Sequence, residues 1–181
     1  MTPPIFRCTL DPSLIPGLLA SYKSAMKKEN AALEAGRRVL LGDFSIRNLL
    51  SIVEWKASRA KGRVQLNSPE DVKEALKAVV DGLGDRAAVA ILTGLNGVRL
   101  PMSSAILTAI FPDRFTVIDI RALEALGTRR ADLSASYYLA YLGYCRHLAL
   151  QYNISLRDVD RALWQSSKNK MYIVKSTAKG S

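Results

Sequence analysis

The chain has 181 residues, of which 49% are hydrophobic and 23% are charged, and its formal net charge is +10 at pH 7. This composition excludes an intrinsically disordered chain, and no run approaches the roughly 20 apolar residues of a membrane-spanning helix. Two cysteines and one histidine are too few for a disulfide framework or a usual metal site. We therefore expect a soluble cytoplasmic protein with no metal, no cofactor and no membrane partner.

The first half of the chain carries helical patterns and strong start signals. A first segment opens at Pro12 and extends toward Gly42, although its polar middle leaves open whether one unbroken helix forms. Asp43 or Ser45 could cap a second helix, whose apolar residues recur at helical spacing: Ile46, Leu49, Leu50, Val53 and Ala57. The run Ser68-Pro69-Glu70-Asp71 combines an N-cap, a first-turn proline and first-turn acids. It predicts a helix from 69 to the glycines at 82–84.

The second half continues the helical pattern around one extended run. Helices are predicted over 86–93 and 101–111, and after an extended run over 115–119 another helix begins at Ile120 and ends at Gly127. Ser134 or Ser136 opens a long helix, and Ser155 opens the last one with a capping-box-like pattern. The sequence thus predicts an all-α domain over 1–174, either one compact unit or two small lobes, and a frayed basic tail over 175–181.

The most informative stretch lies between Leu95 and Arg121, L-N-G-V-R-L-P-M-S-S-A-I-L-T-A-I-F-P-D-R-F-T-V-I-D-I-R. A glycine turn between two helices (about 86–111) is followed by the extended run, which ends in Asp119 (115–121). Such a turn can present backbone N–H groups to a phosphate.

This stretch resembles the helix-hairpin-helix–GPD superfamily of base-excision DNA glycosylases, whose core pattern is L-P-G-V-G, an alanine in the next helix, and V-D. The matching positions are Leu95, Gly97, Val98, Ala105, Ile118 and Asp119. The resemblance covers about a seventh of the chain and implies a helix-hairpin-helix glycosylase-like fold. It also implies duplex DNA as the partner.

Two positions depart from the family pattern. The second glycine of the turn is Arg99, which cannot easily adopt a positive φ but could offer its guanidinium to the phosphate. Family members that also cut the strand carry a nucleophilic lysine two residues later, where this chain has Pro101. A lyase route through that position is excluded. The resemblance therefore implies a monofunctional glycosylase or a relative that has lost catalysis.

Asp119 is the candidate catalytic residue. A carboxylate beside the sugar could stabilise the oxocarbenium-like state that forms when an extruded base leaves, and could orient water. The structural alternative is that Asp119 caps the helix beginning at Ile120. One side chain can serve both purposes.

Trp55, Lys56 and Arg121 are candidates for the substrate pocket. Trp55 could stack on an extruded base, and Lys56 and Arg59 would share one side of a helix. If burial lowered its pKa, Lys56 could also act as a replacement nucleophile. The structural alternative places Trp55 between helices and Lys56 in water. Arg121 could pair with Asp119, hold a phosphate, or bridge to Glu124 or Asp158.

The positive charge is unevenly distributed. Between 37 and 63 there are seven basic residues and two acidic ones, and after Asp160 there are five basic residues and no acid. Clustered positive charge favours a polyanion, because neutralising phosphates releases condensed counterions. We therefore assign duplex-DNA binding to the turn and the nearby basic segment: Asn96, Gly97, Val98, Arg99, Arg59, Lys61 and Arg63. The alternative is a solvated basic face.

A stripe of tyrosines from Tyr137 to Tyr144 could form a base-stacking platform, although such stripes are more often part of a core.

Three hypotheses for the function follow from the sequence. The first is a monofunctional DNA glycosylase that uses Asp119 and water, and the second is a non-catalytic DNA-binding module on the same fold. The third is a basic helical interaction protein without a nucleic-acid role.

Overall fold

The computed structural model describes residues 6–8, 10–22, 26–128 and 133–177 of the chain, with side chains up to 169. Within these residues helices are the only regular secondary structure, so the all-α prediction is confirmed. The 3-10 helices are η1 (Pro12–Leu14) and η3 (Ser58–Ala60). The α-helices are α1 (Ile15–Ser21), α2 (Met26–Leu40), α3 (Ile46–Ala57), α4 (Lys61–Val64), α5 (Pro69–Val80), α6 (Asp85–Thr93), α7 (Leu100–Ile110), α8 (Ile120–Ala125), α9 (Ala135–Tyr152) and α10 (Leu156–Thr177).

Three helices begin at the serine caps that the sequence predicts. The hydroxyl of Ser68 accepts a hydrogen bond from the Asp71 N–H at 3.0 Å, and that of Ser134 accepts one from the Tyr137 N–H at 3.2 Å. Ser155 Oγ accepts the Asp158 N–H at 3.0 Å at the start of α10. Each bond satisfies one of the N–H groups that a helix leaves without a partner in its first turn. Local sequence alone therefore fixes where these helices start.

At the first end of the helical pattern the structure decides what the sequence left open, and at the last end it differs from the prediction. The first segment forms two helices, α1 and α2, and residues 23–25 between them lie outside the described residues. Helix α10 continues to Thr177, past the start predicted for the tail, while 178–181 lie outside the described residues. Lys175 and Lys179 of the predicted tail, and Lys170 before it, have no described side chains.

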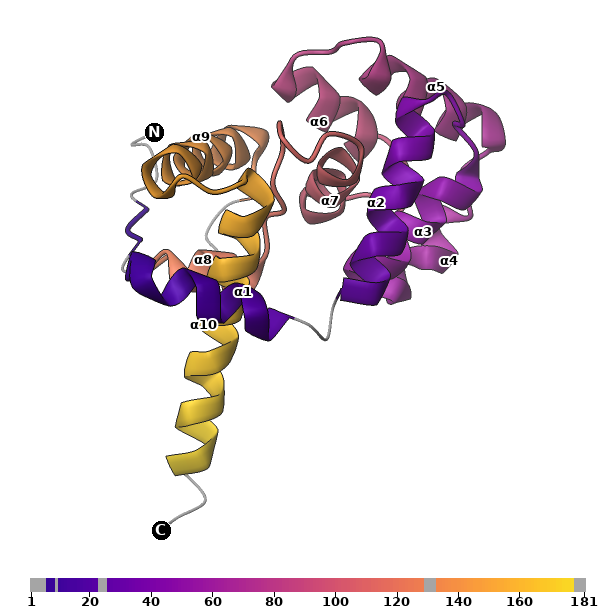
Figure 1. Cartoon of the computed structure of the whole chain (residues 1–181). Helices are drawn as coiled ribbons and strands as arrows, with labels where there is room; N and C mark the ends of the chain where they lie inside the picture. Colours follow the sequence, from indigo (N-terminus) through magenta and orange to yellow (C-terminus); the bar gives the residue numbers. More distant parts are fainter. Residues whose placement is uncertain (1–5, 9, 23–25, 129–132, 178–181) are drawn as a thin grey trace.

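The helices gather in two groups, which Figure 1 separates clearly. We call α2–α7 the hairpin lobe, because it contains the glycine turn, and α1 with α8, α9 and α10 the terminal lobe. Helix α1 lies against α10, where the rings of Tyr22 and Trp164 meet edge to face with centroids 5.4 Å apart. A continuous cluster of buried side chains extends from Ile52 in α3 to Tyr138 in α9 and connects the two lobes.

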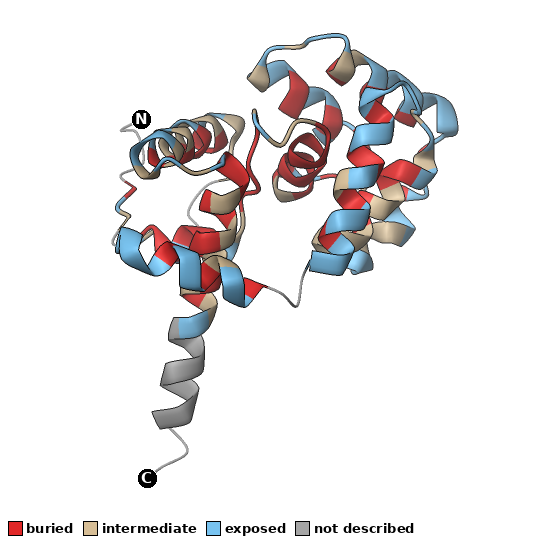
Figure 2. Ribbon diagram, viewed as in Figure 1, coloured by how far each residue is buried: buried red, intermediate tan, exposed pale blue. Residues whose placement is uncertain are grey.

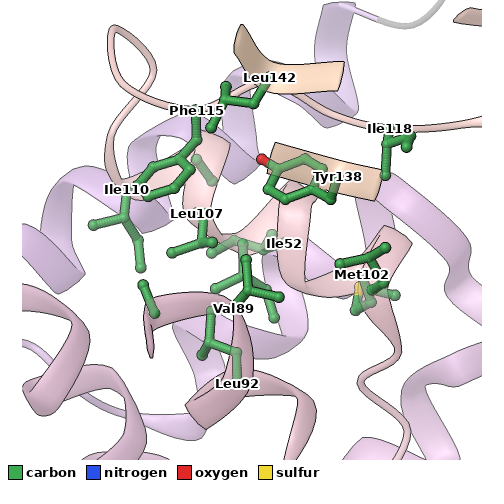
Figure 3. Close-up of a cluster of buried hydrophobic side chains, with 14 of the residues drawn as sticks. Ile52, Val89, Leu92, Met102, Leu107, Ile110, Phe115, Ile118, Tyr138 and Leu142 are labelled. Atoms are coloured by element: carbon green, nitrogen blue, oxygen red, sulfur yellow. The ribbon is translucent and has the colours of Figure 1, made fainter. Parts of the chain in front are cut away.

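Helix α7 forms the centre of the molecule. Its residues from Met102 to Ile110 are all buried, and Figure 2 shows it coloured red along nearly its whole length. Helix α2 approaches α7 closely at Gly36, where a Cβ atom would lie 1.9 Å from the Ala109 carbonyl oxygen. A side chain at Gly36 would therefore push the two helices apart. In Figure 3, Tyr138 and Leu142 of α9 complete this core beside Phe115.

The run 115–119 crosses from the hairpin lobe to the terminal lobe without forming a strand. The hydroxyl of Tyr138 donates to the Thr116 carbonyl at 2.9 Å, and that of Tyr141 donates to the Val117 carbonyl at 3.0 Å. Burial raises the pKa of both phenols, so they stay protonated as donors. These two tyrosines belong to the core, as the alternative to a base-stacking platform predicted. Their hydroxyl groups hold the backbone that leads to Asp119.

Candidate active site and nucleic-acid interface

Asp119 stands at the junction between the extended run and α8. Its Oδ1 atom accepts a hydrogen bond from the Ala122 N–H at 2.9 Å, so it caps α8. Its Oδ2 atom faces the other way and lies 3.5 Å from Lys56 Nζ. Just before it, the Ile118 N–H donates to Ser104 Oγ at 3.1 Å, which joins the run to α7. The carboxylate is therefore held from two sides, with one oxygen used as a cap and the other directed at an amine.

Lys56 comes from the last turn of α3 and is the partner of Asp119. Its Nζ atom lies 3.4 Å from the Ile118 carbonyl oxygen as well as 3.5 Å from Asp119 Oδ2. The side chains of Lys56 and Asp119 retain 14% and 23% exposure, so solvent reaches both groups. Burial lowers the pKa of Lys56, the Asp119 carboxylate opposes this shift, and the positive charge of Arg157 adds to it. The structural alternative had Lys56 facing water or a phosphate; α3 instead directs its amine toward Asp119, with 14% of the side chain exposed.

Lys56 and Arg59 do not share a helical face, contrary to the sequence prediction. Helix α3 ends at Ala57, whose φ of −164° and ψ of 89° break the helical path before η3. Beyond this break Arg59 is exposed, whereas Lys56 points toward Asp119. The spacing argument failed because it assumed an unbroken helix.

Trp55 is half-buried and contributes to the same region, but one of its faces is occupied. The guanidinium of Arg157 lies 5.0 Å from the centroid of the Trp55 ring. Arg157 also forms a two-pronged ion pair with Glu29 of α2, with Nε–Oε1 and Nη2–Oε2 distances of 3.0 and 2.7 Å. Any base that stacked on Trp55 would need its other face.

A buried ionic cluster therefore connects the lobes beside Lys56. Glu29 is fully buried, and it pairs with both Arg157 and Arg161 of α10. Asp160 contacts Arg157, and Asp158 lies 2.9 Å from Arg161. We call Glu29, Arg157, Asp160 and Arg161 the arginine cluster. No local sequence pattern indicates this cluster, because Glu29 and Arg157 are 128 residues apart and each resembles an ordinary surface residue.

Arg121 stacks on an aromatic ring next to this region. Its guanidinium lies 5.3 Å from the ring centroid of Trp164. Of the two carboxylates that the sequence suggests as bridging partners, Glu124 accepts a hydrogen bond from the Ser167 hydroxyl and Asp158 pairs with Arg161. The structure thus places Arg121 on the terminal lobe, against Trp164 of α10.

The glycine turn joins α6 to α7 and has the shape that the sequence predicts. Gly97 has a φ of +77°, and a Cβ atom there would lie 2.9 Å from Arg63 Cβ and 3.0 Å from the Val64 nitrogen. Both the backbone angle and the contact with α4 therefore require glycine. Arg99 has a φ of −95°, an ordinary extended value, so the strain expected for arginine in this turn does not arise.

Asn67 holds the turn in place and was missed in the sequence. This buried side chain accepts a hydrogen bond from the Asn96 N–H at 2.7 Å and donates to the Asn96 carbonyl at 3.0 Å. It also donates to the Val64 carbonyl at 2.7 Å. The turn is thus fastened to the segment after α4. An asparagine before a helix start has no distinguishing pattern, so only the folded chain reveals this role.

The residues assigned to DNA binding divide into two kinds. Asn96, Arg99, Arg63 and Arg59 are exposed, and Arg63 lies directly beside Gly97. Lys61 is half-buried and forms an ion pair of 3.3 Å with Glu54. Val98 is different, because its side chain is buried and its N–H donates to the Leu95 carbonyl at 3.1 Å. Val98 therefore anchors the turn, and its N–H is already used within it.

A hollow of about 340 Å³ lies beside the turn and includes Gly94, Leu95 and Asn96 in its lining. Asp71 and Glu74 also line it, so it does not suit a phosphate. Among the described residues, no three histidine, cysteine, aspartate or glutamate side chains gather as metal ligands, and no helix is long and apolar enough to cross a membrane.

Comparisons of the chain with protein-family models, with curated proteins and with solved structures found no match.

Proposed function

We propose that this protein is a DNA glycosylase, which cleaves the bond between a base and its deoxyribose in duplex DNA. The observation that supports this proposal is the Asp119–Lys56 pair, in which a carboxylate and an amine lie 3.5 Å apart with partial exposure. Ionisable groups whose pKa is shifted by burial and by a charged partner, as that of Lys56 is, cluster at functional sites. The resemblance of the turn and Asp119 to the glycosylase pattern adds the reaction class.

The chemistry assigned to Asp119 follows from its position. As the base leaves with the bonding electrons, the sugar becomes an oxocarbenium-like cation, which a fixed carboxylate stabilises without reorganisation. The Ala122 N–H and the Ser104 hydroxyl hold Asp119 and the preceding residue in place. Its Oδ2 atom remains directed away from α8 and toward Lys56, where a sugar could approach. A water molecule that attacks C1′ would complete base release.

In this proposal the turn holds the phosphate backbone through Arg99 and Arg63. Arg99→Gln should reduce the slope of log affinity against log salt by about 1, because one phosphate contact releases about one counterion. The measurement is fluorescence anisotropy with a duplex over a salt series. Lys77→Gln is the matched control, since Lys77 is exposed on α5, pairs with Asp81, and changes the net charge equally. Equal slopes for the two variants would contradict a local role of Arg99.

The experiment that tests the proposed activity is base release in single turnover. Duplexes with deaminated, oxidised, alkylated or mismatched bases are incubated with excess protein, and abasic sites are revealed by hot alkali. Release from one class of duplex would support the proposal and name the substrate. If no duplex in the panel loses a base, the glycosylase proposal fails.

One observation favours a non-catalytic DNA-binding module as the second candidate. Asp119 Oδ1 already caps α8, and Lys56 neutralises the other oxygen, so the pair would also be explained by a structural role. This candidate predicts salt-sensitive duplex binding with no base release from any duplex. The same panel therefore separates the two candidates.

A further inference from the structure

We propose that Lys56 is an amine nucleophile that attacks C1′ of the deoxyribose at this site and gives the protein a strand-cutting activity. The inference rests on the proposed function and replaces the attacking water with the amine of Lys56, a catalytic residue on α3. It departs from the monofunctional enzyme expected from the sequence, in which Pro101 removes the amine from the turn. The observation that carries it is the placement of the Lys56 amine beside the Asp119 carboxylate and the Ile118 carbonyl.

The geometry gives Lys56 the access that a nucleophile requires. The Nζ atom lies 3.5 Å from Asp119 Oδ2, so a sugar held against the carboxylate has C1′ within reach of the amine. The side chain retains 14% exposure, so it is not fully enclosed by the two lobes. Its contacts at 3.4 and 3.5 Å are long for hydrogen bonds to an ammonium, so the amine is not locked into a tight pair.

The surroundings of Lys56 also favour a neutral amine. Two charged groups of the terminal lobe act on it, namely Asp119 at the start of α8 and Arg157 on α10. Burial and Arg157 lower the pKa of Lys56, and Asp119 acts against them. Because Arg157 is fixed by Glu29 and by the Trp55 ring, its positive charge stays beside the amine. Lysines that react as nucleophiles are activated in this way, by desolvation and a neighbouring cation.

The reaction balances with water as the only other reactant. The lone pair of Lys56 Nζ forms a bond to C1′ as the C1′–base bond breaks, and the base nitrogen takes that electron pair and a proton. The C1′–O4′ bond then opens, O4′ is protonated, and the amine becomes an iminium. Loss of a C2′ proton expels the 3′ phosphate, which cuts the strand. Water then hydrolyses the imine and returns the free lysine.

The test uses a duplex with a preformed abasic site, so that base recognition is not required. Its aldehyde condenses with an amine, water leaves, and sodium borohydride reduces the iminium to a stable covalent adduct. We expect an adduct with the wild-type chain and its loss in Lys56→Arg. Arginine keeps the positive charge beside Asp119 but stays protonated and cannot condense. The matched control, Lys77→Arg, should trap as the wild type does.

Mass spectrometry of the wild-type adduct keeps the test decisive even if the Lys56 variant does not fold. The sugar remnant is expected on Lys56, and its presence on another lysine or on the N-terminus would overturn the inference. No adduct, together with base release that needs alkali for cutting, would also overturn it and leave the proposed glycosylase intact. No adduct, no release and no duplex binding would reject both proposals. An adduct at Lys56 without base release supports this inference alone.

Discussion

Asp119→Asn should lower base release by about 10²- to 10³-fold, the loss typical of removing one electrostatic group that stabilises a transition state. Asparagine keeps an acceptor for the Ala122 N–H, and it is as good an N-cap as aspartate, so α8 and the fold should persist. What the variant loses is the negative charge of the oxygen directed at Lys56. The measurement is the single-turnover rate on the duplex that the wild-type chain cleaves.

The control for this variant is Asp113→Asn. Asp113 is an exposed aspartate in the turn after α7, and the change alters the net charge by the same amount. It should leave the rate unchanged. Duplex affinity should stay nearly constant in both variants, because binding is assigned to the turn around Gly97. A rate for Asp119→Asn equal to that of the wild type would remove Asp119 from the mechanism and favour the non-catalytic module.

Glu29→Ala should destabilise the fold by about 3–5 kcal/mol, the usual result when one partner of a buried ion pair is removed. Glu29 is fully buried and binds two arginines of α10, so its loss leaves positive charge buried at the boundary between the lobes. The measurement is the free energy of unfolding from urea denaturation. Glu34→Ala is the control, because Glu34 pairs with Arg37 and Arg38 on the exposed side of α2.

The contribution of Glu29 to the free energy of unfolding should also depend on pH, and the direction of the pKa shift of Glu29 decides whether acid raises or lowers it. Burial by itself raises that pKa, but the hydrogen bonds and charges of Arg157 and Arg161 outweigh it and hold the pKa below its ordinary value. The contribution of Glu29 is therefore complete above the unfolded pKa of about 4.3 and is lost as the pH falls through the folded pKa. The difference between wild type and Glu29→Ala should narrow below about pH 4. A difference that widened with acid would contradict the assignment.

The arginine cluster also places a fixed positive charge near the Lys56 amine, which we propose as the nucleophile. Arg157 lies against Trp55, the residue before Lys56, and is fixed in turn by Glu29. A loss of Glu29 would therefore disturb the surroundings of Lys56 as well as the stability of the chain. The same side chains connect the lobes and set the charge next to Lys56.

Local sequence patterns predicted the helices well, for a physical reason. Caps such as those of Ser68, Ser134 and Ser155 involve groups three residues apart, so the pattern contains both partners of each bond. Gly97 was equally readable, because only glycine tolerates its φ of +77° without strain. The break after Ala57 was missed, since no proline or glycine marks it.

The sequence by itself determined the all-α class, the starts of the capped helices, the glycine turn and the aspartate that ends the extended run. Only the tertiary structure decided that Lys56 faces Asp119 across a separation of 63 residues, and that Glu29 meets Arg157 across 128. Periodicity and capping describe interactions within a few residues, whereas these pairs depend on how α3 and α2 pack against the terminal lobe. The meeting of charges far apart in the chain is a property of packing, so no local pattern contains it.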